Sequence, residues 1–365
     1  MSNPYVSLVE IAGKGGICHY TYNLAQALSR NKNVEVSTAI TYELEEKPRQ
    51  FRIKRVFNRL KTNPLNVLGY VYDLRKNSLQ VVHFQLSQYP GFVLFLVILV
   101  RLFTHCRIVV TSHNVVSHEE KGWEEYIYQQ IYKTADKIIV HAEHSKKLML
   151  DCFKLPTNKI AVIQHGNYMF FNDNLELEPR VISKEKTVLF FGYIRKYKGL
   201  QYLIQAFAKV REVLPEAKLL IVGKPVEPFD IYQKEIESLN LKDNVETNLE
   251  YVPFEKVKEY FNRAVVIVLP YLDISQSGIV QLAYGFGKPI IATAVGGLPE
   301  AVEDGKSGFV VPPQNVDTLA DRIKTLLNDL SLQKSMGEYS LFLAKTKFSW
   351  DAIAKETIAL YEGLQ

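Results

Sequence analysis

Short apolar runs alternate with helical periodicities along most of the chain. Residues 5–11 and 34–42 are rich in β-branched and apolar side chains, and between them apolar residues recur every three or four positions from Gly16 to Ser29. Similar runs that end in a polar residue or a glycine follow at 79–84, 106–113, 135–142 and 159–166. Short runs separated by helical segments are typical of a parallel sheet covered by helices on both faces.

The pattern breaks at residues 172–186, a polar stretch with Pro179 that we interpret as a linker between domains. A second series of the same kind begins after it. Its apolar runs lie at 187–192, 217–223, 265–270 and 289–296, and helical periodicity covers 200–214 and 229–240. The fold class that we predict is therefore α/β, with two tandem doubly wound Rossmann-like domains.

The end of the chain carries one more helical pattern. In residues 349–364, Trp350, Ile353, Ile358 and Tyr361 fall on one face, so this amphipathic helix needs a groove to cover it. We expect an N-terminal domain over 1–175, a C-terminal domain over 176–345, and a terminal segment over 346–365 that packs back on the first domain.

Charge is distributed unevenly between the two halves. The 365 residues suit two domains of about 150–200 residues each. Residues 1–175 contain 21 Lys and Arg against 14 Asp and Glu, a net charge of +7, and the remainder has 23 against 25, a net charge of −2. A basic front half fits an anionic partner such as a membrane surface, an acidic glycan or a nucleic acid, and it also fits ordinary solubility charge.

Cysteine use and the N-terminus favour a cytoplasmic protein. Cys18, Cys106 and Cys152 are far apart, so they form neither a disulfide framework nor a metal motif. No basic stretch precedes an apolar segment at the N-terminus, so we expect no signal peptide. The longest apolar run, Gly91–Val100, reaches across only about half a bilayer as a helix, and we expect a core or interfacial helix there.

A basic segment precedes that apolar run. Lys47–Lys61 contains seven Lys or Arg and no acid, with Phe51 and Phe57 among them. Together with Gly91–Val100 it indicates peripheral contact with an anionic membrane on the inner face of the cell membrane. A solvated basic face beside a core helix is the alternative. No nucleic-acid-binding pattern accompanies the bases, so we expect no nucleic acid as a partner.

The glycine turn after the first predicted strand is the first candidate binding segment. In parallel α/β sheets, ligands bind beyond the carboxyl ends of the strands. The turn "GKGGI" (13–17) enters a helix, where unpaired N–H groups and the helix dipole favour an anion. We expect Gly15 and Gly16 to contact phosphate or sugar, and the alternative is a tight strand–helix turn. The dinucleotide fingerprint is absent, because Cys18 stands where its third glycine would be.

The matching turn of the second domain, "FFGYIRKYKGL" (190–200), carries three cations. Gly192 ends the strand, and Arg195, Lys196 and Lys198 precede the next helix. The helix dipole disfavours cations at that position, so an anionic ligand explains them better than local structure does. We expect Arg195 and Lys198 to clamp a diphosphate, against the alternative of a solvated basic turn.

The segment from Asp273 to Glu300 is rich in glycine. Ser277, Gly278 and Ile279 begin a helix and offer hydroxyl and N–H donors, and "VGGLPE" (295–300) repeats the arrangement. We expect three of its glycines beside a ligand and the other two at close packing and a helix end. The first three are Gly278, Gly296 and Gly297, and the other two are Gly285 and Gly287.

Two histidines and an asparagine follow strands of the first domain. We expect His113 to reach a ligand and His165 and Asn114 to contact acceptor or sugar, although histidines at such positions also serve as buried structural residues. No His and Cys cluster has zinc spacing, and no Asp-x-Asp pair is present to hold Mg²⁺ on a diphosphate. We therefore expect no metal cofactor, and cationic side chains and helix ends to neutralise a bound diphosphate.

The combination of "GKGG", "TSHN", "FFGYIRKYKG", "SQSGIVQLAYGFGKPIIATAVGGLPEAVEDGKSGFVVPP" and the terminal "SWDAIA…LYEGL" resembles glycosyltransferase family 4, the group 1 glycosyl transferases. The resemblance covers nearly the whole chain and is most specific over 187–313, with a "QSG" donor loop. It implies a GT-B fold, with two domains that face each other across a cleft and a terminal helix that crosses back to the first. It also implies a retaining, metal-independent enzyme.

The same resemblance implies roles for the candidate residues. The second domain would hold a nucleotide-diphosphate sugar as co-substrate, and the first would be the acceptor side. Arg195 and Lys198 would stabilise the leaving diphosphate, the amides of Ser277–Ile279 would hold phosphate or sugar hydroxyls, and Gly16 would approach the diphosphate. His113 would contact the transferring sugar.

The chain departs from the family pattern at two acidic positions. Many members carry two glutamates eight positions apart around the glycine loop, and here these positions fall at Leu282 and near Ile274. Asp273 and Glu300 are the acids that could substitute for them.

We therefore expect a sugar transferase that acts on a glycan or glycolipid in polysaccharide or cell-surface biosynthesis. A degenerate protein that binds nucleotide sugars or protein partners without transfer is one alternative, and a GT-B epimerase or phosphorylase is another.

Overall fold

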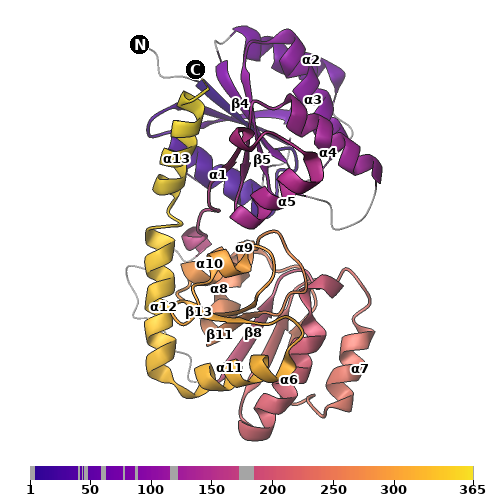
Figure 1. Ribbon diagram of the computed structural model, residues 1–365, viewed down its shortest axis with the longest axis vertical. Helices are drawn as coiled ribbons and strands as arrows, with labels where there is room; N and C mark the ends of the chain where they lie inside the picture. The colour runs from indigo at the N-terminus through magenta and orange to yellow at the C-terminus, as the bar shows by residue number, and fades with distance from the viewer. Residues whose placement is uncertain are drawn as a thin grey trace. The chain divides into compact units, whose positions relative to one another are not determined.

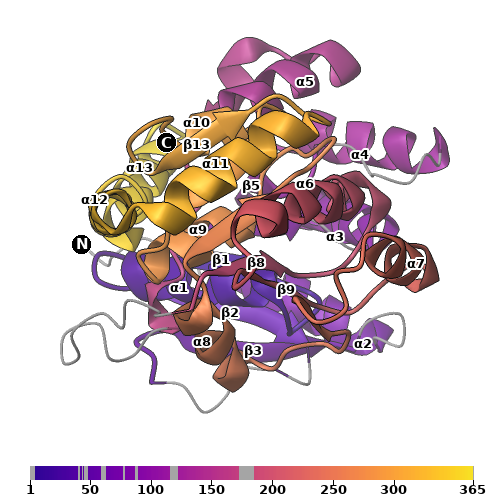
Figure 2. The same cartoon turned by 90° about the horizontal axis from the view of Figure 1, so that it is seen from below.

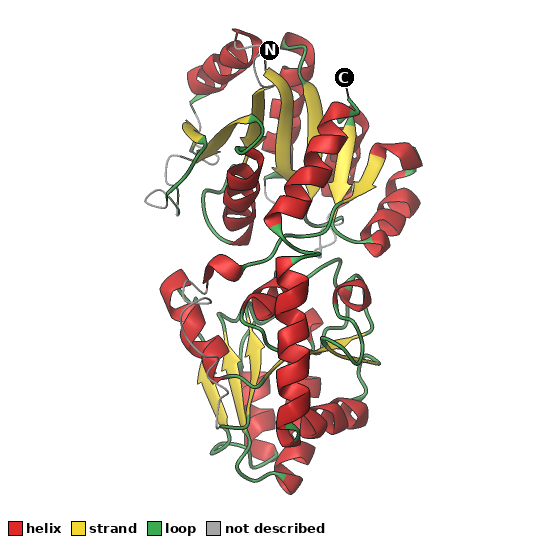
Figure 3. Ribbon diagram, turned by 90° about the vertical axis from the view of Figure 1, so that its left-hand side faces the viewer, coloured by secondary structure: helices red, strands yellow, loops and turns green. Residues whose placement is uncertain are grey.

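The computed structural model describes residues 5–39, 42, 44, 48–58, 63–76, 79–86, 89–115, 122–171 and 185–364. The chain forms two compact units. Unit 1 comprises residues 1–166 and 349–365, and unit 2 comprises residues 167–348. Each unit contains a parallel sheet with helices packed against it, which confirms the predicted α/β class (Figures 1 and 3).

The sheet of unit 1 has the strand order β3-β2-β1-β4-β5-β6-β7, and all neighbours are parallel. Its central strands are almost entirely buried, because helices cover both faces. The strands are β1 (Tyr5–Val9), β2 (Asn33–Ala39), β3 (Arg52–Phe57), β4 (Leu79–Leu86), β5 (Arg107–Ser112), β6 (Lys137–Val140) and β7 (Ile160–Val162).

Two hydrophobic clusters hold the helices of unit 1 on its sheet. On one face α1 (Gly16–Leu28) packs along α13 (Trp350–Glu362), as Figure 1 shows. This contact confirms the expectation that the terminal helix returns to the first domain. The helices on the other face are α2 (Pro64–Lys76), α3 (Pro90–Phe103), α4 (Gly122–Thr134) and α5 (Glu143–Phe153).

Unit 2 has a six-stranded parallel sheet with the order β10-β9-β8-β11-β12-β13. Helices α6 and α11 pack side by side against it (Figure 2). The strands are β8 (Thr187–Phe191), β9 (Lys218–Val222), β10 (Val245–Asn248), β11 (Val266–Leu269), β12 (Ile290–Thr293) and β13 (Gly308–Val311). The helices are α6 (Leu200–Val213), α7 (Asp230–Ser238), α8 (Phe254–Arg263), α9 (Gly278–Gly285), α10 (Leu298–Ala301), α11 (Val316–Asn328) and α12 (Leu330–Lys345).

Each sheet has one point at which the strand order reverses. In unit 1 it lies between β1 and β4, and in unit 2 it lies between β8 and β11. The connections that leave these two strands run to opposite sides, so a crevice forms at their carboxyl ends. The loops that follow β1, β8 and β11 are therefore the first places to look for a ligand site.

The two ends of unit 2 are tied to each other. The backbone N–H of Asn167 donates to the carbonyl of Phe348 over 2.8 Å, and its side-chain amide donates to the carbonyl of Ala344 over 2.7 Å. In unit 1, Gly166 packs so closely on Trp350 that a Cβ at Gly166 would lie 2.5 Å from the indole ring.

Several expectations need correction or fall outside the described residues. Sequence reasoning did not identify β3, which occupies the middle of the basic segment Lys47–Lys61 at the edge of the sheet. Both ends of that segment, and residues 172–184 of the expected linker, lie outside the described residues, as does the expected boundary at 175.

The apolar run Gly91–Val100 lies within α3 and is half buried. One side of the helix contributes to the core, and the opposite side faces solvent. None of the described helices combines the length and the apolarity that crossing a membrane requires.

Candidate active site

The strand-order reversal of unit 2 brings together three of the predicted donor-binding residues. Gly192 follows β8 with a φ of +102°, a conformation that favours glycine. A Cβ at Gly192 would lie 3.2 Å from Nζ of Lys198 and 3.5 Å from Cδ1 of Ile279. Gly192, Lys198 and the start of α9 therefore converge between β8 and β11, where parallel sheets bind ligands.

Lys198 is a buried cation. It is 8% exposed and ends a short 3₁₀ turn, Lys196–Lys198, before α6. Burial and, to a smaller extent, the nearby positive charge of Arg195 together lower the pKa of Lys198 to about 8. Nζ lies 5.6 Å from the ring centroid of Tyr271, a weak cation–π contact. No carboxylate among the described residues forms an ion pair with Lys198, so an anionic ligand would supply its missing countercharge.

Arg195 is held beside Lys198 by the backbone around it. The N–H of Ile194 donates to the carbonyl of Lys224, and the N–H of Val226 donates to the carbonyl of Ile194. Arg195 is half-buried whereas Lys196 is exposed. Arg195 and Lys198 are thus both at least partly buried, as a pair that binds a ligand would be. Lys196, in the same turn, is exposed to solvent.

The N-terminus of α9 is capped by its own residue. Ser277 is the N-cap, and its hydroxyl accepts the N–H of Ile279 over 3.3 Å. One of the amides that we expected to hold a ligand is therefore already paired inside the protein. Gly278 lies against Tyr168, whose ring would be 3.3 Å from an added Cβ, so packing against a protein ring also explains this glycine.

Contacts within the protein also account for Gly296 and Gly297, the glycines that we expected beside a ligand. A Cβ at Gly296 would lie 1.5 Å from the carbonyl oxygen of Ile274, and the N–H of Gly297 donates to the carbonyl of Ser275 over 3.2 Å. These glycines let two loops pair through their backbones.

The remaining two glycines of this segment behave as expected. Gly285 lets the backbone of Tyr168 approach to 3.0 Å of an added Cβ, and Gly287 follows α9 with a φ of +60°. Both serve packing and the helix end.

The candidate acids of unit 2 differ in exposure. Asp273 is exposed, in the loop between β11 and α9. Glu300 is half-buried in the first turn of α10, and its backbone carbonyl accepts from Lys347 over 3.3 Å. The family's glutamate positions, Leu282 and Ile274, are both buried in the hydrophobic core.

In unit 1, a buried glutamate shapes the glycine turn after β1. The carboxylate of Glu10 accepts the N–H groups of Ala12 and Gly13, each over 2.8 Å, and the hydroxyl of Thr38 over 3.1 Å. Sequence reasoning missed Glu10, although an acid directly after an apolar strand and before a glycine turn is a recognisable signal. Because Glu10 uses two amides of the turn, the remaining cradle is the entrance of α1.

That entrance consists of Gly15 and Gly16. Gly15 is the N-cap of α1 with a φ of +79°, and an added Cβ would meet nothing within 4 Å. Conformation, not space, therefore requires glycine at this position. Gly16 is the first residue of α1.

Three histidines gather at the carboxyl ends of β5, β6 and β7. The rings of His113, His141 and His165 surround Tyr20 of α1, with centroids 4.8, 5.3 and 5.0 Å from the tyrosine ring. Nε2 of His141 lies 3.4 Å from Nδ1 of His113. The structure thus joins His113 and His165 through His141, a residue that also follows a strand directly and that sequence reasoning did not single out.

Hydrogen bonds fix these rings. Nε2 of His113 lies 2.9 Å from Oε1 of Gln85. The carbonyl of Ile163 lies 2.9 Å from Nδ1 of His141 and can only accept, so that nitrogen carries the ring proton. Asn114, the third expected contact residue in this region, is half-buried, and its carbonyl accepts from the hydroxyl of Ser112.

The histidines are neutral at physiological pH because they are buried. Burial lowers the pKa of His113 well below its usual value, and it lowers the pKa of His141 to about 4 and that of His165 to about 3. A fourth ring, His83, lies within β4 between Tyr361 and Thr111, each 2.6 Å away, and burial lowers its pKa to about 3. Neutral imidazoles can exchange hydrogen bonds with hydroxyl groups without adding charge.

Across the described ranges, no three His, Cys, Asp or Glu side chains gather in a way that could hold a metal ion.

Known proteins resemble this chain over its whole length. The family model for glycosyl transferases group 1 matches residues 173–341, and the model for glycosyltransferase family 4 matches residues 14–166. The similar structure of Anabaena Alr3699/HepE in complex with UDP has a TM-score of 0.77 at 17% identity, and the match covers 99% of this chain and 100% of that one.

Two curated relatives are similar over about two thirds of this chain. An uncharacterised glycosyltransferase, MJ1607 of Methanocaldococcus jannaschii, is 30% identical over 256 residues, which are 67% of this chain and 64% of the relative. D-inositol 3-phosphate glycosyltransferase of Corynebacterium glutamicum is 30% identical over 246 residues, 64% of this chain and 58% of the relative. The chain thus spans about three-fifths of the length of these relatives. With matches to both family models and the two parallel sheets, the chain belongs to the group 1 glycosyl transferases of glycosyltransferase family 4 and has their GT-B fold.

Proposed function

We propose that the protein is a retaining, metal-independent glycosyltransferase that moves a sugar from a nucleotide-diphosphate sugar to a glycan or glycolipid acceptor. The observation that carries the proposal is the buried Lys198, whose ammonium lies at the carboxyl ends of β8 and β11 beside Gly192 and the start of α9. A diphosphate is a ligand whose negative charge suits this position. The UDP complex of the Anabaena protein supports testing UDP sugars first.

Transfer breaks the bond between the anomeric carbon and the diphosphate oxygen. Negative charge then develops on the leaving diphosphate, and groups that stabilise it accelerate the reaction. Lys198 would meet that charge as a point charge, and Arg195 would meet it with its planar fork of N–H donors. The acceptor hydroxyl forms the new bond on the same face of the sugar, and its proton goes to the departing phosphate.

Two other parts of the proposal, the independence from metal ions and the position of the acceptor, are supported by different observations. Two cations at the diphosphate position take the place that a divalent ion would otherwise fill. We assign the acceptor side to the neutral histidines of unit 1, which gather around Tyr20 at the carboxyl ends of their strands. His113 would contact the transferring sugar. His165 and Asn114 would contact the acceptor or the sugar.

We further propose a cytoplasmic protein that acts in polysaccharide or cell-surface biosynthesis at the inner face of the cell membrane. The basic segment Lys47–Lys61 and the exposed side of α3 support this location.

The second candidate function is that of a degenerate protein, which binds nucleotide sugars or protein partners but does not transfer the sugar. Leu282 and Ile274 place buried aliphatic side chains where the family pattern has glutamates, so the nucleotide and the sugar lose carboxylate partners there. Asp273 and Glu300 are the acids left in this region that could take over those contacts.

Donor hydrolysis distinguishes the two candidates. Purified protein would be incubated with a panel of UDP-, GDP- and ADP-sugars, and release of the nucleoside diphosphate would be measured together with binding. We expect slow release from one of them and its loss in Lys198→Ala. Lys196→Ala is the matched control, because Lys196 lies in the same turn but is exposed.

Binding without release from any sugar would favour the degenerate protein. Full release in Lys198→Ala would contradict the assignment of this lysine to the diphosphate. Identification of the sugar product separates transfer from epimerisation.

A further inference from the structure

Gln85 of unit 1 has a buried amide nitrogen without a hydrogen-bond partner among the described residues. The side chain is 5% exposed and the nitrogen is closed to solvent, so water does not replace the missing partner. At the other end of the same amide, Oε1 lies 2.9 Å from Nε2 of His113. A buried N–H group without a partner is unfavourable, and native proteins keep few of them. The folded chain alone therefore does not explain this amide.

Turning the amide around does not remove the unpaired group. The nitrogen would then donate to His113, and the oxygen would take the position without a partner. In either orientation one end of the Gln85 amide binds His113, and the other end finds no partner among the described residues.

Gln85 lies at the crevice of unit 1. It is the last residue but one of β4, and the strand order reverses between β4 and β1. The register of these two strands makes Gln85 the neighbour of Glu10 across them. His83, two positions earlier on β4, bonds to Tyr361 of α13, so Gln85 faces the side of the sheet on which α13 packs. The unpaired amide group is thus at the edge where parallel sheets bind ligands.

The groups around the amide favour an uncharged ligand group. The neighbouring carboxylate of Glu10 would repel a phosphate or another anion. Burial keeps His113 neutral by lowering its pKa, so the ring supplies no countercharge. An ammonium ion has no lone pair to accept from the amide N–H, whereas a hydroxyl group both donates and accepts. A hydroxyl therefore pairs with the amide in either of its orientations.

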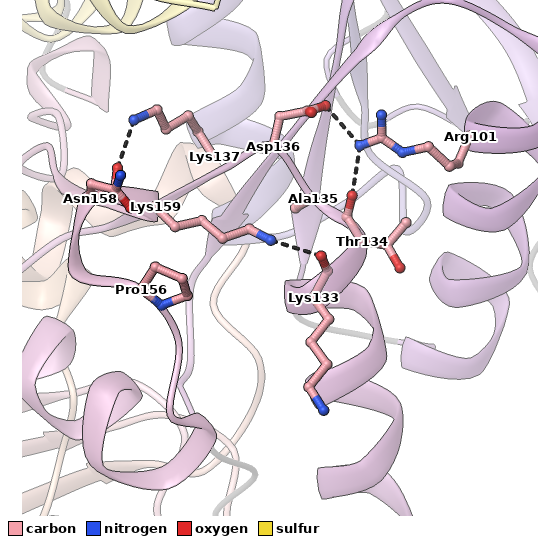
Figure 4. A pocket seen from close by; sticks show the side chains of 9 residues that line it. All are labelled: Arg101, Lys133, Thr134, Ala135, Asp136, Lys137, Pro156, Asn158 and Lys159. Atoms are coloured by element: carbon pink, nitrogen blue, oxygen red, sulfur yellow. Dashed lines mark hydrogen bonds and ion pairs between the residues drawn. The ribbon is translucent and has the colours of Figure 1, made fainter.

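The basic pocket of unit 1, by contrast, holds polar groups that are already paired. It has a volume of about 610 Å³ and lies at the amino ends of β6 and β7, at the opposite edge of the sheet (Figure 4). Arg101 donates there to the carbonyl of Thr134 over 2.7 Å. Nζ of Lys159 donates to the carbonyl of Lys133, also over 2.7 Å. Both carbonyls belong to the last turn of α4, where a helix leaves carbonyls unpaired and favours cations.

We propose that Gln85 binds a hydroxyl group of the acceptor sugar, with the end of its amide that does not bind His113. This role rests on the proposed transferase function and names the group that unit 1 recognises. Because the nitrogen is closed to solvent, a covering side chain must move before the hydroxyl reaches it. The hydrogen bond that forms favours this movement, so acceptor binding and a local rearrangement are coupled. A site built around such an amide discriminates against a ligand that lacks the hydroxyl.

Transfer to small acceptors tests this role. The full chain would receive the donor that it hydrolyses together with p-nitrophenyl glycosides of glucose, galactose, mannose and N-acetylglucosamine. Gln85→Met keeps the length of the side chain and removes the amide. We expect it to lower kcat/KM for transfer to the glycoside about tenfold relative to donor hydrolysis, because tenfold corresponds to about 1.4 kcal/mol, the size of one hydrogen bond. Gln80→Met, at an exposed position of the same strand, is the matched control and should keep both rates.

Gln85→Glu separates the hydrogen bond from the shape of the side chain. Burial raises the pKa of a carboxyl group. A protonated carboxyl offers an O–H and a carbonyl, as the amide offers an N–H and a carbonyl. We therefore expect transfer relative to hydrolysis to lie about tenfold below that of the wild type at about pH 8 and to recover as the pH falls to about 6. Gln85→Met should show no such recovery.

Three results would overturn the proposal. The first is transfer that Gln85→Met retains, and the second is a Gln85→Glu variant that does not recover at the lower pH. The third is an equal loss of transfer and hydrolysis together with a fall in Tm of more than about 6 °C, which would identify a structural residue.

Failure of the transferase function itself can be recognised separately. Absence of both hydrolysis and transfer in the wild type would contradict that function and leave the role of Gln85 open to a binding measurement. In that case, and if hydrolysis occurs without transfer, binding of the same glycosides would be measured by calorimetry. We expect binding about tenfold weaker in Gln85→Met and unchanged in Gln80→Met. A wild-type protein that binds none of the glycosides would also overturn the proposal.

Discussion

Mild acid is the perturbation to which the buried histidines of unit 1 make this protein most sensitive. All eight histidines of the chain lie within residues 1–166, so unit 2 has none. Burial lowers the pKa of His83 and His165 to about 3 and that of His141 to about 4. In the unfolded chain each would return to about 6.5.

Whether acid stabilises or destabilises the folded protein depends on which state binds more protons. Below about pH 6.5 the unfolded chain takes up protons at these rings while the folded unit stays neutral. The stabilisation from the neutral rings is therefore complete above that pH and is lost as the pH falls towards 4. At about pH 5.5 each unfolded histidine is about 90% protonated, which lowers the free energy of unfolding by about 1.4 kcal/mol. The three rings together give a loss of about 4 kcal/mol.

Tryptophan fluorescence reports this change. Both tryptophans of the chain, Trp123 and Trp350, belong to unit 1, and Trp350 lies 5.2 Å from the ring of Tyr20. Urea titrations of Trp123→Phe at about pH 7.5 and about pH 5.5 would follow Trp350 alone. With a slope of about 2 kcal/mol per molar urea, the midpoint should fall by about 2 M.

Histidine variants separate this mechanism from general acid effects. His165→Gln should reduce the pH slope by about 1.4 kcal/mol per pH unit, the contribution of one ring. His105→Gln, at an exposed position, should keep it. A free energy of unfolding that changes by less than about 1 kcal/mol between the two pH values would refute the claim that the rings are buried and neutral.

Three further predictions concern the two candidate sites. The affinity for UDP, measured by calorimetry, should fall as the pH rises through about 8, because Lys198 then loses the proton that pairs with the diphosphate; affinity that is constant from pH 7 to 9 would contradict that pairing. Glu10→Gln should destabilise the protein by about 1–3 kcal/mol in thermal unfolding, since one of the two N–H groups that Glu10 accepts would face an amide N–H. Gly296→Ala should destabilise it by several kcal/mol, because the new Cβ would lie 1.5 Å from the carbonyl oxygen of Ile274, whereas Gly305→Ala should lose only about 1 kcal/mol, because that glycine has a φ of +76° but nothing within 4 Å.

The apolar runs predicted the strands well because a fully buried parallel strand has few alternatives. The central strands β1, β8 and β11 lie where the runs are, and the terminal helix has the expected face on the core. β3 escaped notice because an edge strand needs only one or two buried residues, and Arg52, Lys54 and Arg55 conceal its pattern.

The candidate site could be predicted where a residue type is unfavourable for the local secondary structure, so that a ligand explains it better. Lys198 precedes a helix, where a cation is disfavoured, and the structure shows it buried. The role of Gly296 could not be read from the sequence, because a glycine indicates that something comes close without showing what, and here the carbonyl of Ile274 does. The contact between His141 and His113 could not be predicted in the same way. It depends on β5 and β6 being neighbours in the sheet, and the sequence does not specify the order of the strands.

The hydrogen bond from Asn167 to Phe348 has a consequence for how this protein can be taken apart. Because the two ends of unit 2 meet, residues 167–348 are an insertion in the chain of unit 1, with entry and exit side by side. An inserted domain of this kind can be removed without straining the domain that contains it, because the two cut ends already lie close together. A short flexible peptide from Gly166 to Ser349 should then give unit 1 as a separate protein. Replacing residues 167–348 by the matching part of a relative would test whether donor preference moves with that unit.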